Sequence, residues 1–227
     1  MTFVGLLGIV IPKQQDHSMI PSDLQARILN QLPKMNGWCD PKKALDLAEA
    51  VIASKPSVCV EIGVFAGKSL IATGMALEHV GSGKVWGIDP WAVADCLVDE
   101  NEENKKWWSQ DVNLESIFAE ALNHLSDNGL LNKHAELIRQ SSLTAWRGWP
   151  ADTHQIDILH IDGNHSEWAS STDVVLWLPY LKRGGTLFMD DYDWESTQTA
   201  KKLIERQCVL VREEKLPESH YAVYHKK

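Results

Sequence analysis

The 227-residue chain lacks several features that mark other classes of protein. No run of Lys and Arg is longer than two residues and the formal net charge is −9, which argues against nucleic acid and anionic membranes as partners. No apolar stretch is long enough to span a bilayer. The sequence has no internal repeat and no low-complexity segment. These absences favour a globular protein that acts on a small polar or neutral molecule.

Cysteine is also scarce. The four cysteines, at positions 39, 59, 96 and 208, form no C-x-x-C pair and have no zinc-like spacing. This pattern predicts a reducing compartment, and we expect a cytoplasmic protein. The apolar residues 3–12 follow no basic segment and precede no small-residue cleavage site, so we interpret them as a packed arm. Such an arm is compatible with a homo-oligomer.

The chain divides into residues 1–54, a helical extension or lid, and residues 55–227, one α/β domain. The extension predicts one helix that carries Leu24, Ile28 and Leu32 and a second that starts at Asp40-Pro41. In the domain, strands alternate with helices. Strands are expected at 58–65, 84–89, 135–140, 156–162, 186–190, 208–212 and 221–224, and helices at 67–80, 114–128 and 195–207, with an apolar helix between 162 and 190. Residues 91–113 are acidic and predict an irregular segment. The alternation indicates a mostly parallel, doubly wound sheet, and the closing pair of strands could include an antiparallel one.

Glycines mark the turn from the first strand to the first helix, in Glu61-Ile-Gly63-Val-Phe65-Ala-Gly67-Lys-Ser69. Glycine lets backbone approach a ligand, and a helix N-terminus favours a negative group. The spacing does not fit a P-loop, and Phe65 replaces the middle glycine of a nicotinamide fingerprint. The turn therefore predicts a ligand with an adenosine-like part and a carboxylate but no pyrophosphate. An ordinary strand-to-helix turn is the alternative.

Two further strand ends fit the same ligand. Asp89 ends the second strand, where a carboxylate can accept both ribose hydroxyls. Ser141-Ser142 ends the third, at a position suited to an adenine edge.

Carboxylates follow the next two strands. Asp162 and the pair Asp190-Asp191 end strands joined by one crossover helix, so three acidic groups should converge at one edge of the sheet. Such crowding needs a cation or shared protons. We therefore expect a site for Mg²⁺, or for Mn²⁺ or Ca²⁺. The alternatives are that Asp191 or Asp193 caps the following helix and that Asp162 binds a cofactor amine.

His165 lies three residues after Asp162, and a histidine titrates near neutral pH, so it is the candidate general base. A histidine in a loop that caps a helix is the alternative. His160 lies inside a strand and is expected to be a buried histidine with satisfied hydrogen bonds. Five of the ten tryptophans lie in segments that should flank the cleft, where aromatic faces suit sugar rings and planar rings equally: Trp91, Trp107, Trp108, Trp168 and Trp194.

Together these motifs resemble the class I S-adenosylmethionine-dependent methyltransferases over residues 55–227. The residues that carry the resemblance are Glu61-x-Gly63-x-x-x-Gly67, Gly87-Ile-Asp89, Asp157-Ile-Leu-His-Ile-Asp162-Gly and Gly184-Gly-Thr-Leu. The acidic groups resemble those of the metal-dependent O-methyltransferases of sugars and catechols. The pair is Asp-Asp, as in the sugar enzymes, whereas catechol enzymes have Asp-Asn.

The resemblance implies a Rossmann-like seven-stranded sheet of order 3-2-1-4-5-7-6, with helices on both faces and strand seven antiparallel. It implies contacts of Glu61, Gly63 and Ser69 with the methionine portion, of Asp89 with the ribose and of Ser142 with the adenine. Phe65, Gly67, Trp91, Ser141 and Asp162 complete the candidate cofactor site. Asp162, Asp190 and Asp191 would hold the metal, and His165 and Asp162 would be catalytic.

The expected activity is O-methylation of a small-molecule hydroxyl with S-adenosylmethionine and a divalent ion. Three alternatives remain open at this point. They are a metal-independent methyltransferase acting on nitrogen or a carboxylate, a protein that binds the cofactor without turnover, and a nicotinamide-linked enzyme.

Overall fold

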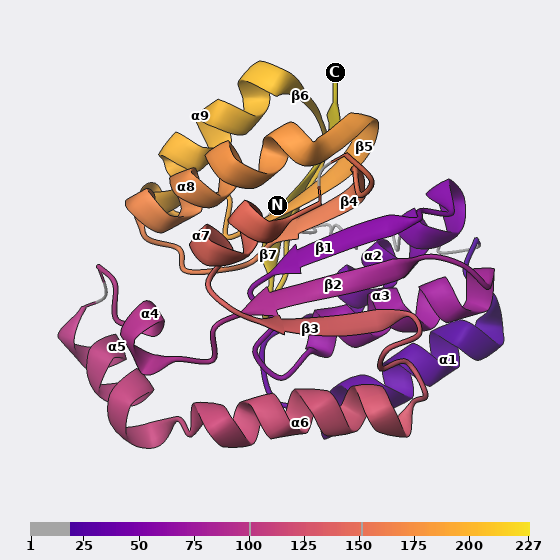
Figure 1. Ribbon diagram of the computed structural model, residues 1–227, viewed down its shortest axis with the longest axis horizontal. Coiled ribbons are helices and arrows are strands. Elements are labelled where there is room, and N and C mark those ends of the chain that lie inside the picture. Colours follow the sequence, from indigo (N-terminus) through magenta and orange to yellow (C-terminus); the bar gives the residue numbers. More distant parts are fainter. Residues whose placement is uncertain (1–18, 100, 151) are drawn as a thin grey trace, which may run out of the picture.

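The computed structural model describes residues 19–99, 101–150 and 152–227, and its centre is a seven-stranded sheet (Figure 1). The strand order is β3-β2-β1-β4-β5-β7-β6, as the resemblance implies. β7 runs antiparallel to β5 and β6, and the other neighbours are parallel. The strands are β1 (Val58–Ile62), β2 (Lys84–Asp89), β3 (Ala135–Arg139), β4 (Ile156–Ile161), β5 (Leu181–Asp190), β6 (Cys208–Lys215) and β7 (His220–Lys226).

Helices cover both faces of the sheet (Figure 1). One face carries α1 (Ser22–Gln31), α2 (Pro41–Ser54), α3 (Lys68–Val80) and α6 (Leu114–Asp127). The other carries α7 (Ser142–Ala145), α8 (Glu167–Trp177) and α9 (Gln198–Gln207). Short 3-10 turns occur at Leu32–Lys34, Trp146–Gly148, Leu178–Tyr180 and Glu195–Thr197.

The two layers give two hydrophobic clusters, one on each side of the sheet. Successive residues of a strand point to opposite faces, so Ile158 of β4 joins the cluster under α3, and Leu159 joins the cluster under α8. This double burial explains why β4 is almost continuously apolar. The sheet thereby holds its strand ends in fixed positions, and the polar residues discussed below lie there.

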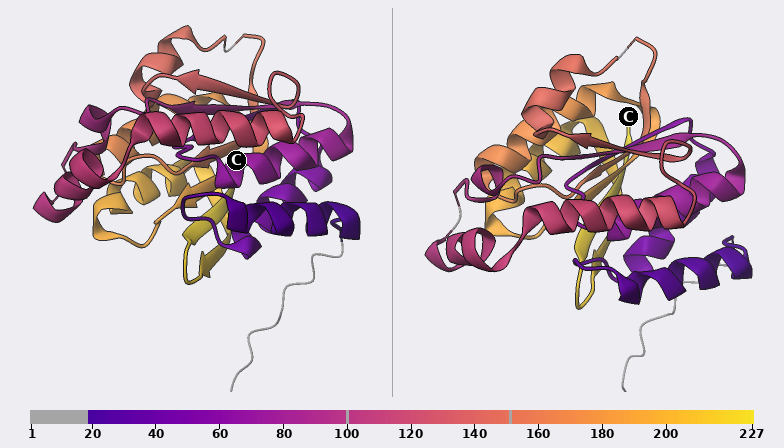
Figure 2. Two further views of the ribbon diagram at one scale, coloured as in Figure 1. Left: turned by 90° about the horizontal axis from the view of Figure 1, so that it is seen from below. Right: turned by 60° about the horizontal axis from the view of Figure 1, so that its bottom comes forward.

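The N-terminal helices belong to this core. Leu24 and Ile28 of α1 and Leu47 of α2 lie in the same cluster as Leu70 of α3. α1 also lies beside α6 (Figure 2), where Arg27 Nη2 donates to the Asn128 carbonyl at 3.1 Å. The division of the chain at residue 54 and the lid function stay predictions. The apolar residues 3–12 lie outside the described residues.

α2 begins where the sequence predicts. Pro41 occupies the first helical position, and Asp40 caps the helix by accepting a hydrogen bond from Lys42 N at 2.9 Å. This cap fixes the first turn of α2, and Lys43 lies in that turn.

Two sequence predictions about elements were wrong. Residues 91–113 are not irregular, because they contain α4 (Val93–Cys96), α5 (Glu102–Lys106) and a π-helical turn (Trp107–Asp111). Asn101 caps α5 by accepting from Asn104 N, which lets a polar, acidic segment start a helix. β5 also begins five residues earlier than expected, at Leu181 rather than 186. In the part of the chain that the structure describes, no helix is long and apolar enough to cross a membrane.

Candidate active site

A cavity of about 650 Å³ opens at the carboxyl ends of β1, β2, β4 and β5. Most residues predicted for the site lie in its wall, although Glu61 and Gly67 do not. Those in the wall are Gly63, Phe65, Ser69, Asp89, Trp91, Ser141, Ser142, Asp162, His165, Asp190 and Asp191. The sequence therefore predicted the location of the cavity.

The turn after β1 needs glycine at position 63. Gly63 has a φ of +83°, and a Cβ there would lie 1.9 Å from the carbonyl oxygen of Asp162. Asp162 N in turn donates to Ile62 O at 2.8 Å. The backbones that follow β1 and β4 thus touch directly, which puts the predicted cofactor turn beside the acidic residues.

Asp89 holds this turn together. Its Oδ2 accepts from Val64 N at 2.9 Å and Phe65 N at 3.0 Å, and its Oδ1 accepts from Trp91 N at 2.8 Å. Burial raises the pKa of Asp89, although the three backbone hydrogen bonds oppose this shift. Trp91 closes the arrangement from the other side, since its Nε1 donates to Phe65 O at 2.9 Å. The contact of Asp89 with a ribose stays a prediction.

Glu61 lies behind the cavity wall and is almost fully buried. Its Oε1 accepts from Ser69 Oγ at 2.7 Å, and its Oε2 lies 3.1 Å from His160 Nδ1. Glu61 therefore fixes Ser69 and His160 in this structure. Its contact with a methionine portion stays a prediction.

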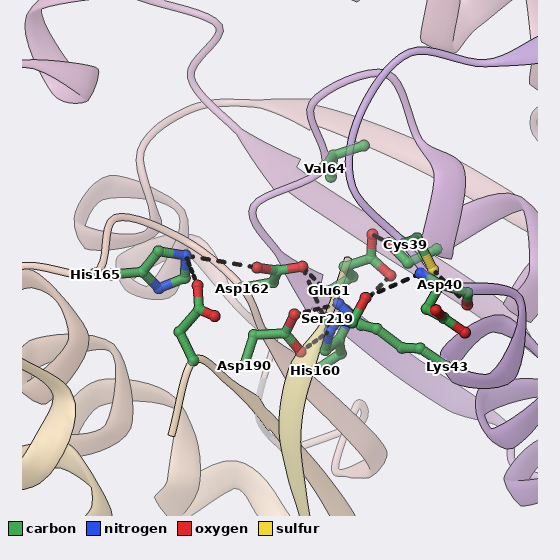
Figure 3. A network of polar contacts seen from close by, with 12 residues as sticks. Cys39, Asp40, Lys43, Glu61, Val64, His160, Asp162, His165, Asp190 and Ser219 are labelled. Atoms are coloured by element: carbon green, nitrogen blue, oxygen red, sulfur yellow. Dashed lines mark hydrogen bonds and ion pairs between the residues drawn. The ribbon is translucent and has the colours of Figure 1, made fainter. Parts of the chain in front are cut away.

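A buried lysine lies at the place predicted for the metal ion. Lys43 Nζ, from α2, donates to Asp162 Oδ2 at 2.8 Å and also to Asp190 Oδ2 (Figure 3). The Lys43 side chain has no exposed surface. Two of the three predicted metal ligands therefore share one buried ammonium group, which is not part of the cavity wall.

His160 completes this buried cluster. Its Nε2 lies 3.2 Å from Asp190 Oδ1 and its Nδ1 faces Glu61, so both ring nitrogens have partners, as expected for a buried histidine. Burial and Lys43 lower the pKa of His160, but the hydrogen bonds to Asp190 and Glu61 outweigh them and raise it to about 9. His160 is therefore protonated at neutral pH and adds a second positive charge.

The two carboxylates beside Lys43 respond differently. Burial and the charge of Asp190 raise the pKa of Asp162 to about 6, against the lowering effect of Lys43. Burial also raises the pKa of Asp190, but Lys43 and His160 outweigh it and hold that pKa well below its usual range. Asp190 lies between both cations, which explains the difference. Burial alone would lower the pKa of Lys43. The charges of Asp162 and Asp190 outweigh burial and raise this pKa above its ordinary value, so Lys43 stays charged.

Asp191 does not join the predicted ion site. Its Oδ2 lies 3.0 Å from His165 Nε2, while Asp162 Oδ1 lies 3.7 Å from the same nitrogen. Among the described residues, the acidic or imidazole groups close enough to share one ion are His160, Asp162 and Asp190. The structure thus brings Asp162 and Asp190 together with His160 and not with Asp191, and the ligand set Asp162, Asp190 and Asp191 stays a prediction.

Ser142 also has a partner that the sequence did not reveal. Its Oγ donates to Oδ1 of Asp173, a buried residue of α8 whose carboxyl group lies in the cavity wall. Burial raises the pKa of Asp173 to about 7. The predicted adenine position thus contains a carboxyl group that can donate or accept a hydrogen bond near neutral pH.

Aromatic rings cover the cavity near its mouth. Trp38 lies 5.4 Å from Phe65 and 5.7 Å from Trp107 between ring centroids, and Trp108 lies 6.2 Å from Phe65. Trp38 is 57% exposed, which is unusual for so large an apolar side chain. Trp194, also in the cavity wall, packs edge-on against His165 at 5.2 Å. The cavity therefore offers a flat apolar surface next to the candidate base.

Three residues of this region were not predicted from the sequence as site residues, namely Lys43, Asp173 and Trp38. A signal existed for Lys43, because it lies four residues before Leu47 and so shares the buried face of α2. A charged residue on an apolar helix face needs a partner, which is a reason to search for carboxylates. Asp173 interrupts the buried face of α8 in the same way.

The fold and this cavity define the class of protein. The strand order, with its antiparallel β7 and the glycine turn after β1, is the Rossmann-like fold of class I methyltransferases. Residues 60–192 match the family described as Methyltransferase domain, and the chain belongs to that family.

Solved structures share this fold across most of the chain. One is a putative O-methyltransferase from Klebsiella pneumoniae, with a TM-score of 0.63, 14% identity, and 92% of this chain and 93% of that one covered. Another is the O-methyltransferase TomG from Streptomyces achromogenes, involved in tomaymycin synthesis and solved with SAM (TM-score 0.62, 14% identity, 92% and 91% covered). A third is an O-methyltransferase from Bacillus cereus in complex with SAH (TM-score 0.59, 13% identity, 91% and 92% covered). At these identities the likeness concerns the fold.

Proposed function

We propose that the protein is an S-adenosylmethionine-dependent O-methyltransferase that modifies a hydroxyl group of a small molecule. Family membership supports methyl transfer, and similar structures were solved with SAM or SAH. The turn after β1, with Gly63 and Ser69, and the Ser142–Asp173 pair supply suitable positions for the two ends of this cofactor. When bound, the cofactor supplies a methyl group that is already activated by its sulfonium.

The observation that carries the choice of a hydroxyl acceptor is the contact between His165 and Asp191. His165 Nε2 lies 3.0 Å from Asp191 Oδ2, and the side chain lies in the cavity wall, where its imidazole can accept a proton from a bound hydroxyl group. A hydroxyl oxygen needs such a base, because it is a poor nucleophile while it keeps its proton. As the proton moves to His165, the imidazolium that forms lies beside the carboxylates of Asp191 and Asp162, which stabilise it.

The cavity limits the acceptor. About 650 Å³ must contain both cofactor and acceptor, so the acceptor is a small molecule. Trp194 lies 5.2 Å from His165, and Trp38 and Trp107 line the same cavity, so apolar faces are available that suit a sugar or a planar ring. The acidic residues in the wall and the net charge of −9 favour a neutral or cationic acceptor.

The divalent ion predicted from the sequence does not fit the residues as they stand. An ammonium already lies between Asp162 and Asp190, and Asp191 faces His165 instead. His160, Asp162 and Asp190 would be the ligands if Lys43 withdrew, so metal dependence is the second candidate form of the activity.

The test combines calorimetry with product analysis. We expect S-adenosylmethionine and S-adenosylhomocysteine to bind with one site per chain. Incubation with a panel of phenols, catechols and sugars should give S-adenosylhomocysteine together with an O-methylated product, identified by NMR. Absence of cofactor binding would reject the proposal, and a product methylated only on nitrogen or on a carboxylate would reject the hydroxyl acceptor.

A further inference from the structure

We propose that the ammonium of Lys43 is the permanent cation of this site, in the place where related enzymes of the resemblance would hold a divalent ion. This inference rests on the proposed methyl transfer and adds a positioning residue to it. Lys43 touches neither the cavity nor a substrate position, so it acts through Asp162 and Asp190.

The geometry excludes a simple coexistence of the two cations. Lys43 Nζ lies within hydrogen-bond distance of one oxygen of each aspartate, and these same residues are the ones that an ion would require (Figure 3). A metal ion at hydrogen-bond distance from an ammonium would suffer strong repulsion in a buried site. An ion could enter only if Lys43 left.

The structure around Lys43 holds its side chain in place. Its side chain is fully buried in the first turn of α2, which Pro41 and the Asp40 cap fix in place. The helix is packed on the core through Ala44, Leu47 and Val51. Withdrawal would leave a buried charge without its carboxylates, which is strongly unfavourable.

The carboxylates also have partners without an ion. Lys43 Nζ contacts Asp162 and Asp190, and the ring nitrogens of His160 lie 3.2 Å from Asp190 and 3.1 Å from Glu61. Lys43 therefore supplies the positive charge that an ion would otherwise supply to the acidic strand ends.

This replacement has a consequence for the acceptor. A metal ion keeps open coordination positions that substrate oxygens can occupy. The ammonium of Lys43 instead donates its hydrogen bonds to Asp162 and Asp190. Two neighbouring hydroxyls are then not needed to chelate an ion. Lys43 instead holds Asp162 so that its other oxygen, Oδ1, faces His165 at 3.7 Å. The acceptor needs a single hydroxyl within reach of His165.

The experiment removes the ammonium and offers a metal instead. Lys43→Ser opens the space between the aspartates, Lys43→Arg keeps the charge, and Lys42→Ser is the matched control on the same turn, since Lys42 contacts Asp46 and Glu214 outside the site. Mn²⁺ binding is measured by electron spin resonance on the full chain of each protein. Melting temperatures are compared in EDTA and in MnCl₂. Neither measurement requires an acceptor.

We expect the native protein and Lys42→Ser to bind no Mn²⁺ at this site and to melt at the same temperature in EDTA and MnCl₂. Lys43→Ser should bind Mn²⁺ and gain melting temperature from it. With an acceptor found as described above, native turnover should be unchanged in EDTA. Turnover of Lys43→Ser in EDTA should fall roughly 100-fold, because Asp162 is misplaced, and should partly recover with Mn²⁺.

Native turnover that requires Mg²⁺ or Mn²⁺, or tight binding of Mn²⁺ by the native protein, would overturn the role of Lys43 and leave O-methyl transfer intact. Failure of the native protein to bind S-adenosylmethionine would instead overturn the proposed function. If Lys43→Ser does not fold, the measurements on Lys43→Arg and on the native protein in EDTA still test whether Lys43 replaces an ion. An active native enzyme whose turnover is lost in EDTA contradicts the inference.

Discussion

His165 shows how much the role of one side chain depends on its nearest neighbours. Its Nε2 lies between two carboxylates, at 3.0 Å from Asp191 and 3.7 Å from Asp162. Both carboxylates would stabilise an imidazolium. In the proposed mechanism, Asp191, which the sequence predicts as a metal ligand, is also the group that orients the base.

Replacing the base tests this role. We expect His165→Gln to lower kcat by about 10²- to 10⁴-fold, because the glutamine amide cannot take the hydroxyl proton. Asp191→Asn should lower kcat less, since it removes orientation and charge but keeps the base. Calorimetry should show little change in S-adenosylmethionine affinity for either variant. A kcat equal to that of the native enzyme in His165→Gln would remove His165 from the mechanism.

Asp173 makes stability depend on pH. Burial raises its pKa to about 7, against the hydrogen bond from Ser142. The unfolded chain has an Asp pKa of about 3.9, so the folded protein holds this proton more tightly. The resulting stabilisation is complete below about pH 4 and is lost as the pH rises to about 7, by at most about 1.4 kcal/mol per pH unit.

Asp173→Asn should remove this dependence, because an amide has nearly the shape of the protonated acid and cannot ionise. We expect the variant to melt higher than the native protein at pH 8 and close to it at pH 4. Thermal unfolding at the two pH values measures the difference. An equal difference at both pH values would show that Asp173 does not titrate in this range.

At the scale of the element, the turn after β1 combines two constraints. Gly63 needs both a left-handed backbone and the absence of a Cβ, whereas Gly81, at the end of α3, needs only the backbone conformation. Their φ angles are nearly equal, +83° and +79°, but no atom lies within 4 Å of a Cβ built on Gly81. Substitutions at Gly81 and Gly63 therefore distinguish the free-energy cost of a left-handed backbone from the cost of a steric contact with Asp162.

We expect Gly81→Ala to lose about 1 kcal/mol of unfolding free energy, from the left-handed backbone alone. Gly63→Ala should lose several times more and should also weaken S-adenosylmethionine binding, because the turn must move away from Asp162. Denaturant unfolding and calorimetry on both variants make the comparison. Equal losses of stability would show that the close approach of Gly63 to Asp162 is not tight.

The sequence predicted elements well where local signals were strong. β2 begins and ends at the predicted residues, and α3 ends at Val80 before Gly81 as expected. Residues 91–113 were missed because short helices there depend on caps such as Asn101 rather than on an apolar period. The start of β5 was missed because Gly184 and Gly185 suggested a break within what is one strand.

At the scale of the whole molecule, the alternation of strands and helices predicted a mostly parallel sheet, and the family resemblance supplied the strand order, which the structure confirms. That order brings the strand ends together. The sequence did not predict that Lys43, from α2, contacts Asp162 and Asp190, which lie 119 and 147 residues later in the chain. That contact depends on how α2 packs against the sheet. Motifs near the strand ends therefore predicted the acidic groups, and only the tertiary structure revealed the lysine that neutralises them.

A crystal structure would show directly whether Lys43 takes the place of a metal ion, if the native protein is grown with S-adenosylhomocysteine, soaked in MnCl₂ and measured with anomalous data for manganese. We expect S-adenosylhomocysteine in the cavity, Lys43 Nζ between Asp162 and Asp190, and no anomalous peak at that position. A manganese peak bound by Asp162 and Asp190, with Lys43 displaced, would show that the site is a metal site.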